Sequence, residues 1–383
     1  MKPRTDSVVP GLIAIIAMAC SAADDRPSSF AGSPILHLAD TVLLQESDSA
    51  FLGQLMVTFA VDSNGTMYIG DQGLNRLLVF NSDGRLRRII GRFGKGPGEF
   101  SDVGFVTLFR DSVLLQSSGA RTLSLLRERD GIELKRIVHP GFVSRGAATK
   151  DHIVLGDFER LAGSAVILVS WDSLLRTPDP VRLVPNSVTT PSLYSQFREL
   201  LIFNSVPVAA KSDTLVVGFG VGDFILHIDP SGQIVDTIWT PVRLRRGTPP
   251  TVLPRYRNPR ISFHDAISGV SGLRAMWFTR TGHLVLWFED GSTEDPSRVN
   301  SPTTGVAYLA VITPDLGRAC VDASLEAPGT RRTRLSFGRD TLYSLDQFVD
   351  SSAADPQVRT VIRKYSIHLA NCEWLTTADR PRY

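Results

Sequence analysis

Short runs of β-forming residues alternate with turn residues along this chain. Between residues 56 and 100 there are four such runs, and the first three end at Ser63-Asn64-Gly65, Asp71-Gln72-Gly73 and Ser82-Asp83-Gly84. Asn-Gly and Asp-Gly between β-rich runs are strong hairpin signals, because these residues tolerate a positive φ. Four strands in about 45 residues match the size of one β-propeller blade.

The second of these runs recurs along the chain, each time after a turn pair such as Asn64-Gly65, Ser212-Asp213 or Thr281-Gly282. Its recurrence predicts an all-β fold, a six-bladed β-propeller of four-stranded blades over residues 34–383. The alternatives are a seven-bladed ring and a β-sandwich, but a sandwich would not repeat one turn-and-strand pattern. The copies span residues 66–69, 112–115, 152–155, 214–217, 283–286 and 341–344.

An apolar run at residues 35–44 precedes the first blade. A propeller whose two ends stayed unpaired would leave an open strand edge, and proteins avoid exposing such edges. We therefore expect this N-terminal strand to pair with the last blade and to close the ring.

The segment 56–100 also carries a specific repeat pattern. An Asp-x-x-Gly turn precedes the second strand, Asn-Arg opens the third, Asp-Gly follows it, and the glycine-rich stretch 94–100 leads to the next blade. This pattern resembles the NHL-type repeat, and the resemblance implies a bacterial lipoprotein of the NHL-type six-bladed β-propeller family. The matching residues are Asp62, Gly65, Tyr68, Asp71, Asn75, Arg76, Phe80, Asp83 and Gly84.

The N-terminus has the features of an export signal. Lys2 and Arg4 precede an apolar run at 8–18, which ends in small residues before Cys20. This order predicts a secretory signal peptide over residues 1–20, and the run is too short to span a bilayer.

Cys20 stands where the cysteine of a bacterial lipobox would be acylated. We therefore expect a protein exported to the cell envelope and lipid-anchored to a membrane, with residues 21–33 as a flexible tether. The alternative is an ordinary cleaved signal with an incidental cysteine.

Two further cysteines, Cys320 and Cys372, follow in the exported part. They are expected after the third strands of the fifth and sixth blades, in comparable places of neighbouring blades. An oxidising compartment permits a disulfide bond between them. The alternative is a pair of buried free thiols.

The spacing between the copies of the second strand shows where the chain carries extra length. We expect insertions between one blade and the next at 185–201 and 240–271, and between second and third strands at 291–305 and 350–356. Both kinds of loop emerge on the same face of a propeller. Because drift would scatter insertions over both faces, the pattern favours a single loop-rich binding face.

Acidic residues follow the second strand in several blades: Asp71, Asp157, Glu289 and Asp346. If their carboxylates converged at the channel mouth, they could bind Ca²⁺ or a cationic ligand. The alternative is that each carboxylate caps a turn or pairs with a nearby arginine, as Asp71 would with Arg76. The sequence has no motif for a transition-metal site, and it predicts no other cofactor.

The insertion at 240–271 is rich in arginine and proline. Arginine recognises carboxylates and phosphates through its planar fork, and prolines keep a loop extended. We expect Arg255, Arg257, Arg260 and the nearby His264 to contact a ligand. The alternative is a solvated loop packed over the rim of the propeller. The same insertion also contains Arg243, Arg245 and Arg246.

The formal net charge of +2 argues against nucleic acid as a partner, since proteins that bind the phosphate backbone usually carry a strong basic excess. No nucleophile motif is found, so the sequence predicts no catalytic residue. It favours a binding module that displays its loop-rich face to a protein, a peptide or a glycan. The alternative is a propeller enzyme, a lyase or a hydrolase, that acts at the channel mouth with a bound metal.

Overall fold

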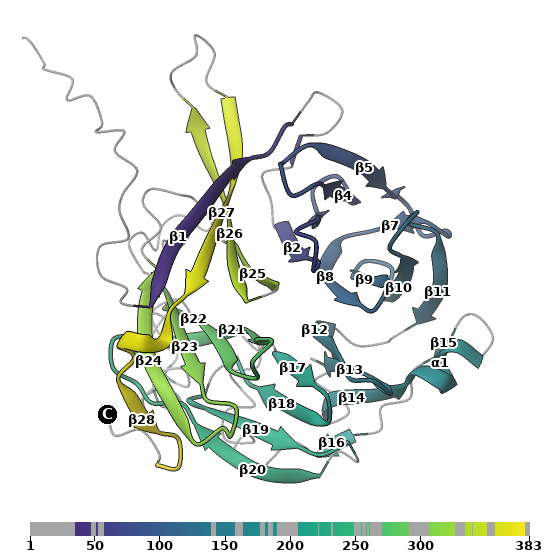
Figure 1. Cartoon of the computed structure of the whole chain (residues 1–383). Coiled ribbons are helices and arrows are strands. Elements are labelled where there is room, and N and C mark those ends of the chain that lie inside the picture. The colour runs from purple at the N-terminus through teal and green to yellow at the C-terminus, as the bar shows by residue number, and fades with distance from the viewer. Residues whose placement is uncertain are drawn as a thin grey trace, which may run out of the picture. The chain divides into compact units, whose positions relative to one another are not determined.

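Antiparallel hairpins arrange this chain into six small sheets, each of which is one blade, beside a short two-stranded ribbon (Figure 1). Blades one to five take their four main strands in chain order from the inside outward, whereas blade six takes its outermost strand from the N-terminal end. The fold is an all-β, six-bladed β-propeller, and the prediction from the repeated second strand is confirmed.

The computed structural model describes residues 35–46, 51–52, 57–138, 143–157, 164–176, 181–182, 187–189, 206–220, 222–230, 233–248, 254, 258, 260, 270–290, 306–325, 334–338, 340–350 and 357–379. All of them belong to one unit, residues 32–383. The signal peptide, Cys20 and the tether predicted for residues 1–33 lie outside the described residues. No helix of the described part is long and apolar enough to cross a membrane.

The first three blades share one strand order. Blade one comprises β2 (Val57–Val61), β3 (Met67–Asp71), β4 (Arg76–Phe80) and β5 (Leu86–Ile90). Blade two comprises β8 (Val103–Phe109), β9 (Ser112–Ser117), β10 (Thr122–Arg127) and β11 (Glu133–Val138). Blade three comprises β12 (Val143–Ala148), β13 (His152–Asp157), β14 (Ser164–Ser170) and β16 (Ser187–Thr189).

The remaining blades complete the ring. Blade four comprises β17 (Val208–Lys211), β18 (Thr214–Gly218), β19 (Phe224–Ile228) and β20 (Ile234–Trp239). Blade five comprises β21 (Ser271–Phe278), β22 (Leu284–Asp290), β23 (Val306–Ile312) and β24 (Arg318–Leu325). Blade six comprises β25 (Arg334–Gly338), β26 (Thr341–Asp350), β27 (Gln357–Ile367) and β1 (Leu36–Leu43).

The second and third strands of each blade form the core. In blade one, Met67, Tyr68 and Ile69 of β3 and Leu77 and Leu78 of β4 are completely buried. Each strand has a hydrogen-bonded neighbour on both sides, and other blades cover the faces of the sheet. Strands buried on both faces are apolar throughout rather than alternating. This is why the second strands are visible in the sequence as unbroken apolar runs.

The innermost strands of neighbouring blades touch one another around the axis of the ring. Strand β2 contacts β25 and β8, β12 contacts β8 and β17, and β17 contacts β21. Between blades five and six, the ring of Trp277 on β21 stacks on the ring of Phe337 on β25, with 6.2 Å between centroids. The inner strands therefore surround one common axis.

Strand β1 closes the ring as predicted. It pairs antiparallel with β27, from Leu36 opposite Ile367 to Leu43 opposite Val361. At the inner edge of the contact between blades six and one, the backbones approach closely. A Cβ atom on Gly338 would lie only 2.9 Å from the carbonyl oxygen of Val61. A side chain there would push blade six away from blade one.

The C-terminal segment crosses back to blade five. After the short helix η2 (Leu369–Asn371), strand β28 (Trp374–Thr376) pairs with β24 as a fifth strand. Cys320 and Cys372 form a disulfide bond, with 5.3 Å between their Cα atoms. Both cysteines follow the third strand of their blade in the chain; Cys320 lies within the fourth strand of blade five, whereas Cys372 lies just after η2. The bond holds the tail on that blade, and disulfides typically stabilise a fold by about 2–4 kcal/mol.

Not all the extra length of the chain lies on one face, as the sequence had suggested. In blade three, helix α1 (Trp171–Arg176) and strand β15 (Val181–Arg182) follow the third strand, on the face opposite the predicted insertions. Strand β15 pairs in parallel with β11 of blade two. The side chain of Trp171 is buried against the ring of Phe109. The segment from α1 to β15 therefore links blade three to the outer edge of blade two. Strand β16 lies within residues 185–201, which the sequence predicted to be a loop.

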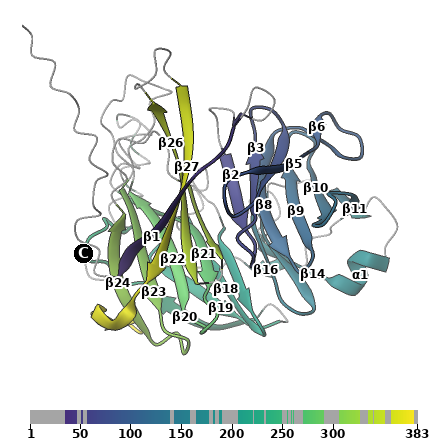
Figure 2. The ribbon, with the colours of Figure 1, turned by 45° about the horizontal axis from the view of Figure 1, so that its top comes forward.

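One hairpin extends past the rest of its blade. Strand β25 pairs with β26 only as far as Leu345, and β1 pairs with β27 only as far as Val361. The ladder between β26 and β27 continues to Asp350 opposite Gln357. Its tip projects on the side where second strands end (Figure 2). A smaller ribbon of β6 (Arg92–Phe93) and β7 (Glu99–Phe100) joins blades one and two.

Candidate functional site

One face of the propeller holds the ends of all second strands and the beginnings of all first strands; we call it the loop face. The stretches between β20 and β21, residues 240–270, and between β22 and β23, residues 291–305, both belong to it. These are the longest connections of their kinds between described strands, so the loop face is where the sequence predicts binding. The short turns between first and second strands lie on the opposite face.

The acidic residue of blade one closes a turn. Asp71 is the last residue of β3, and its side chain is completely buried. Its Oδ1 accepts a hydrogen bond of 3.0 Å from the backbone N–H of Leu74, and its Oδ2 lies 3.7 Å from Nε of Arg76. Asp71 therefore makes both of the structural contacts that the sequence offered as the alternative to cation binding.

Two further acidic positions also meet arginines within their own blades. Glu289 accepts a hydrogen bond of 2.8 Å from Nε of Arg274, and Asp346 pairs with Arg363. The carboxylate of Asp346 also accepts a 2.8 Å hydrogen bond from Ser344. Asp157 ends β13, but its side chain lies outside the described residues.

Among the described residues there is no group of three or more His, Cys, Asp or Glu side chains that could hold a metal ion. The predicted Ca²⁺ site comprised Asp71, Asp157, Glu289 and Asp346, and the three of these carboxylates whose side chains are described each engage an arginine. Such pairing reduces the negative charge that a cation would need.

The arginine-rich insertion is described only in part. Arg255, Arg257 and His264 lie outside the described residues. Arg260 is exposed, and its backbone N–H donates a 3.0 Å hydrogen bond to the side chain of Asn258.

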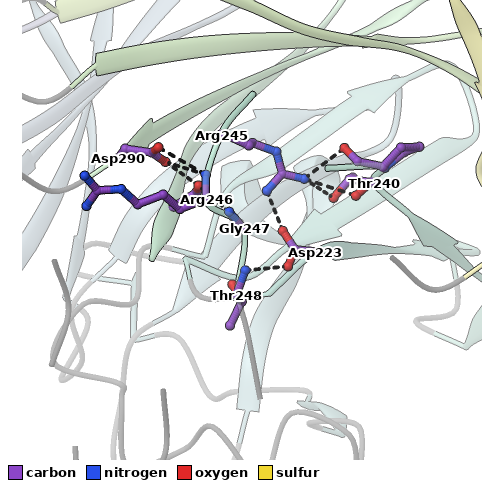
Figure 3. Close-up of polar contacts among 9 residues, drawn as sticks. Asp223, Thr240, Arg245, Arg246, Gly247, Thr248 and Asp290 are labelled. Carbon is purple, nitrogen blue, oxygen red and sulfur yellow. Dashed lines mark hydrogen bonds and ion pairs between the residues drawn. The ribbon is translucent and has the colours of Figure 1, made fainter. Parts of the chain in front are cut away.

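The beginning of that insertion is part of the core. The side chain of Arg245 is completely buried; it forms an ion pair with Asp223 and donates a 3.0 Å hydrogen bond to the carbonyl of Thr240 (Figure 3). Its guanidinium lies 3.9 Å from the centre of the Phe288 ring. The other carboxylate oxygen of Asp223 accepts a 2.6 Å hydrogen bond from the N–H of Thr248. Arg245 is therefore a clamp between blades four and five.

A second buried carboxylate fixes the same segment to blade five. Asp290, the last residue of β22, accepts a hydrogen bond of 3.1 Å from the backbone N–H of Arg246 (Figure 3). It also accepts a hydrogen bond from the hydroxyl of Ser271. Burial raises the pKa of Asp290, although these hydrogen bonds act in the opposite direction. Residues 240–248 thus have a fixed path from β20 to the start of β21.

The axis of the ring has its own set of charged groups. The charged residues of the six inner strands are Arg145, Lys211, Arg274 and Arg334, and none is acidic. Lys211 lies at the opposite face, where its ammonium group donates to the carbonyl of Thr279 at 2.9 Å. The other three, which we call the axial arginines, lie towards the loop face on blades three, five and six.

The axial arginines of blades three and six stand at equivalent register positions. Arg145 lies opposite Gly156, the residue before Asp157. Arg334 lies opposite Leu345, the residue before Asp346. Because the second strands align in the repeat, these two arginines occupy the same level of the ring.

Arg274 reaches this level through a β-bulge. The register of β21 against β22 shifts between Leu273, opposite Phe288, and Ala275, so that Arg274 is the extra residue. Bulges redirect a side chain and are common beside functional sites. The ion pair of Arg274 is with Glu289, directly after Phe288.

The side chains of the axial arginines act on one another electrostatically. Burial, followed by the positive charges of Arg334 and Arg274, lowers the pKa of Arg145 to about 10. All three side chains are only partly buried. Sequence reasoning missed this set, because the repeat was aligned on second strands. An alignment of the first strands would have placed Arg145 and Arg334 in one column.

Sequence comparison points to the same fold. Residues 35–105 match DUF5128, a family described as a six-bladed beta-propeller. The match covers β1, blade one and the start of blade two. No curated protein shows a significant sequence match to this chain.

The solved structures that are similar to this chain include two from Bacteroides species. One is a proposed exported protein of Bacteroides fragilis NCTC 9343, with a TM-score of 0.55 and 11% identity over 88% of this chain and 96% of that one. The other is a member of the DUF4221 family from Bacteroides vulgatus, with a TM-score of 0.57 and 11% identity over 88% of this chain and 99% of that one. At this level of identity the likeness shows the fold alone.

The buried clamp gives a direct prediction about stability. Replacing Asp223 by Ala leaves the guanidinium of Arg245 buried without this carboxylate, and removing one partner of a buried ion pair costs about 3–5 kcal/mol. We expect that loss in the free energy of unfolding, measured by chemical denaturation.

The matched control is Arg243→Ala, two positions away from Arg245. Arg243 forms an exposed ion pair with Glu373, and exposed pairs contribute less than about 1 kcal/mol. Equal effects of Asp223→Ala and Arg243→Ala would show that Arg245 is not a clamp.

Proposed function

We propose that this chain is an exported, lipid-anchored binding module that displays the loop face of its propeller to a protein, a peptide or a glycan. The order of basic, apolar and small residues before Cys20 supports export and acylation. A Bacteroides fragilis protein with the same fold is also a proposed exported protein. The anchor would keep the propeller at a membrane surface.

The observation that carries the binding role is how the longest insertion begins. Its first residues, 240–248, are built into the core by the buried contacts of Arg245 and by Asp290. A loop that had only grown by drift would not need buried charged anchors at its base. Binding proteins commonly carry variable loops on rigid supports of this kind.

We further propose that the blades are of the NHL type. Asn75 has a φ of 55°, a left-handed value that asparagine tolerates better than most residues. The next residue, Arg76, pairs with Asp71 across the same turn. The Asp and Asn-Arg positions of the repeat thus have a common physical role, which is to close the turn between the second and third strands.

A metal-dependent propeller enzyme and a Ca²⁺ site both stay predictions of the sequence. The contacts of Asp71, Glu289 and Asp346 with arginines favour the binding module, because a cation would have to compete with three guanidinium groups for these carboxylates. An anionic group on the ligand fits the same face better.

The anchor is tested by Cys20→Ala. Without the acylated cysteine, the protein should move from the membrane fraction to the soluble exported fraction, because the lipid supplies the membrane affinity. Fractionation followed by immunoblotting measures the change. Membrane association that stays the same, or a mature N-terminus that does not begin at Cys20, would remove the anchor from the proposal.

The binding face is tested by replacing Arg255, Arg257 and Arg260 with Ala. Binding to an array of acidic glycans and acidic peptides should weaken, while the Tm changes little, because surface substitutions usually alter stability by less than about 0.5 kcal/mol. The control replaces three exposed arginines from turns on the opposite face. These are Arg85, Arg129 and Arg280. An equal loss of binding in both triple variants would contradict a specific loop face.

A further inference from the structure

The axial arginines bring three positively charged groups to one level of the ring. Their side chains are partly exposed, lie at one level of the ring and come from three different blades. Like charges brought together in a partly buried place destabilise the charged forms of the groups. An arrangement of this kind is maintained more often for a ligand than for stability.

The inner strands of blades one, two and four supply no charged residue at this level. In blade one Thr58 lies opposite Gly70, the residue before Asp71. In blade two the register shift of β8 leaves both Gly104 and Phe105 between Val103 and Val106 at this level, and in blade four the backbone N–H of Gly218 donates to the carbonyl of Pro207 there. No acidic residue occurs on any inner strand, so the inner strands themselves supply only positive charge to the axis.

We infer that Arg145, Arg274 and Arg334 form a binding site on the propeller axis for a sulfate or phosphate group. Such a group has two negative charges and enough oxygen atoms to accept hydrogen bonds from three guanidinium forks at once. Glu289 holds the side chain of Arg274 by a 2.8 Å hydrogen bond and limits its freedom before the anion binds. The group is either a free ion or the end group of a larger ligand.

This inference deepens the proposed function, since it takes the loop face as the side from which the ligand arrives. The two can nevertheless fail separately. A small ion needs only the axial arginines, whereas a glycan or a peptide also needs the loops above them. The variant with Arg255, Arg257 and Arg260 replaced should therefore still bind inorganic sulfate and phosphate.

The test is isothermal titration calorimetry of the mature protein with sodium sulfate and with sodium phosphate at low ionic strength. Arg145→Gln and Arg334→Gln should each weaken binding about tenfold or more, because each removes charge-assisted hydrogen bonds. Arg280→Gln, on the opposite face, is the matched control and should bind like the wild type. Sodium chloride at equal ionic strength should give no saturable heat.

The stability of the variants separates a ligand site from a structural role. Without the anion, the Tm of Arg145→Gln and of Arg334→Gln should stay close to that of the wild type, because both side chains are only partly buried and glutamine can still hydrogen bond. With added sulfate, the Tm of the wild type should rise and that of the variants should not. Arg145→Lys keeps the charge without the fork, and it should bind more weakly than the wild type while staying folded.

Three results would overturn the inference. One is the absence of saturable sulfate and phosphate binding to the wild type. A second is equal affinity in the wild type and in the variant with both Arg145→Gln and Arg334→Gln. The third is a large fall in the Tm of the single variants without anion, which would make these arginines structural.

A sulfated saccharide and a phosphorylated one, titrated beside the free ions, distinguish the source of the group. If a saccharide binds more tightly than the free ion and this binding is lost in Arg334→Gln, the site recognises the end group of a larger ligand. Binding of the free ions alone, lost in the same variant, would support a site for the ion itself.

Discussion

The pairing of β1 with β27 is the contact on which the rest of this structure depends. A ring of blades has two ends, and an unpaired strand edge at either end would be exposed to pairing with other chains. Leu36–Leu43 covers the outer edge of blade six, and so connects the N-terminal end of the propeller to its last blade. Once the ring is closed, the inner strands of all blades are held at fixed heights around one axis. Residues on blades three, five and six then stand at one level of the ring, although they are far apart in the sequence.

The charged groups inside this protein are of two kinds. In the clamp between blades four and five, Arg245 meets Asp223 and the ring of Phe288, so that a buried charge is compensated in place. At the axis, burial and the positive charges of Arg334 and Arg274 lower the pKa of Arg145. The first arrangement fixes a loop base and contributes to stability. The second is the arrangement that we propose as an anion site.

The second strands and the ring closure could be predicted because they follow from local rules. Turn pairs such as Asn64-Gly65 mark hairpins, and double burial makes strands such as β3 continuously apolar. The excursion through α1 and β15 could not be predicted, because its pairing with β11 leaves no periodic signal. The burial of Arg245 runs against the usual exposure of arginine, so its segment was grouped with a solvent-facing loop. The common level of the axial arginines depends on the register of the first strands. Because Arg274 lies in a bulge, no fixed sequence spacing relates it to the other two.

We propose that ring closure brings three arginines from separate blades to one anion site. Crystals grown at low chloride and soaked in sodium selenate test it most directly, since selenium gives an anomalous signal and selenate has the shape and charge of sulfate. The account predicts an anomalous difference peak on the propeller axis, within hydrogen-bonding distance of Arg145, Arg274 and Arg334. Selenate bound only elsewhere on the surface, with these three side chains turned away from one another, would contradict it.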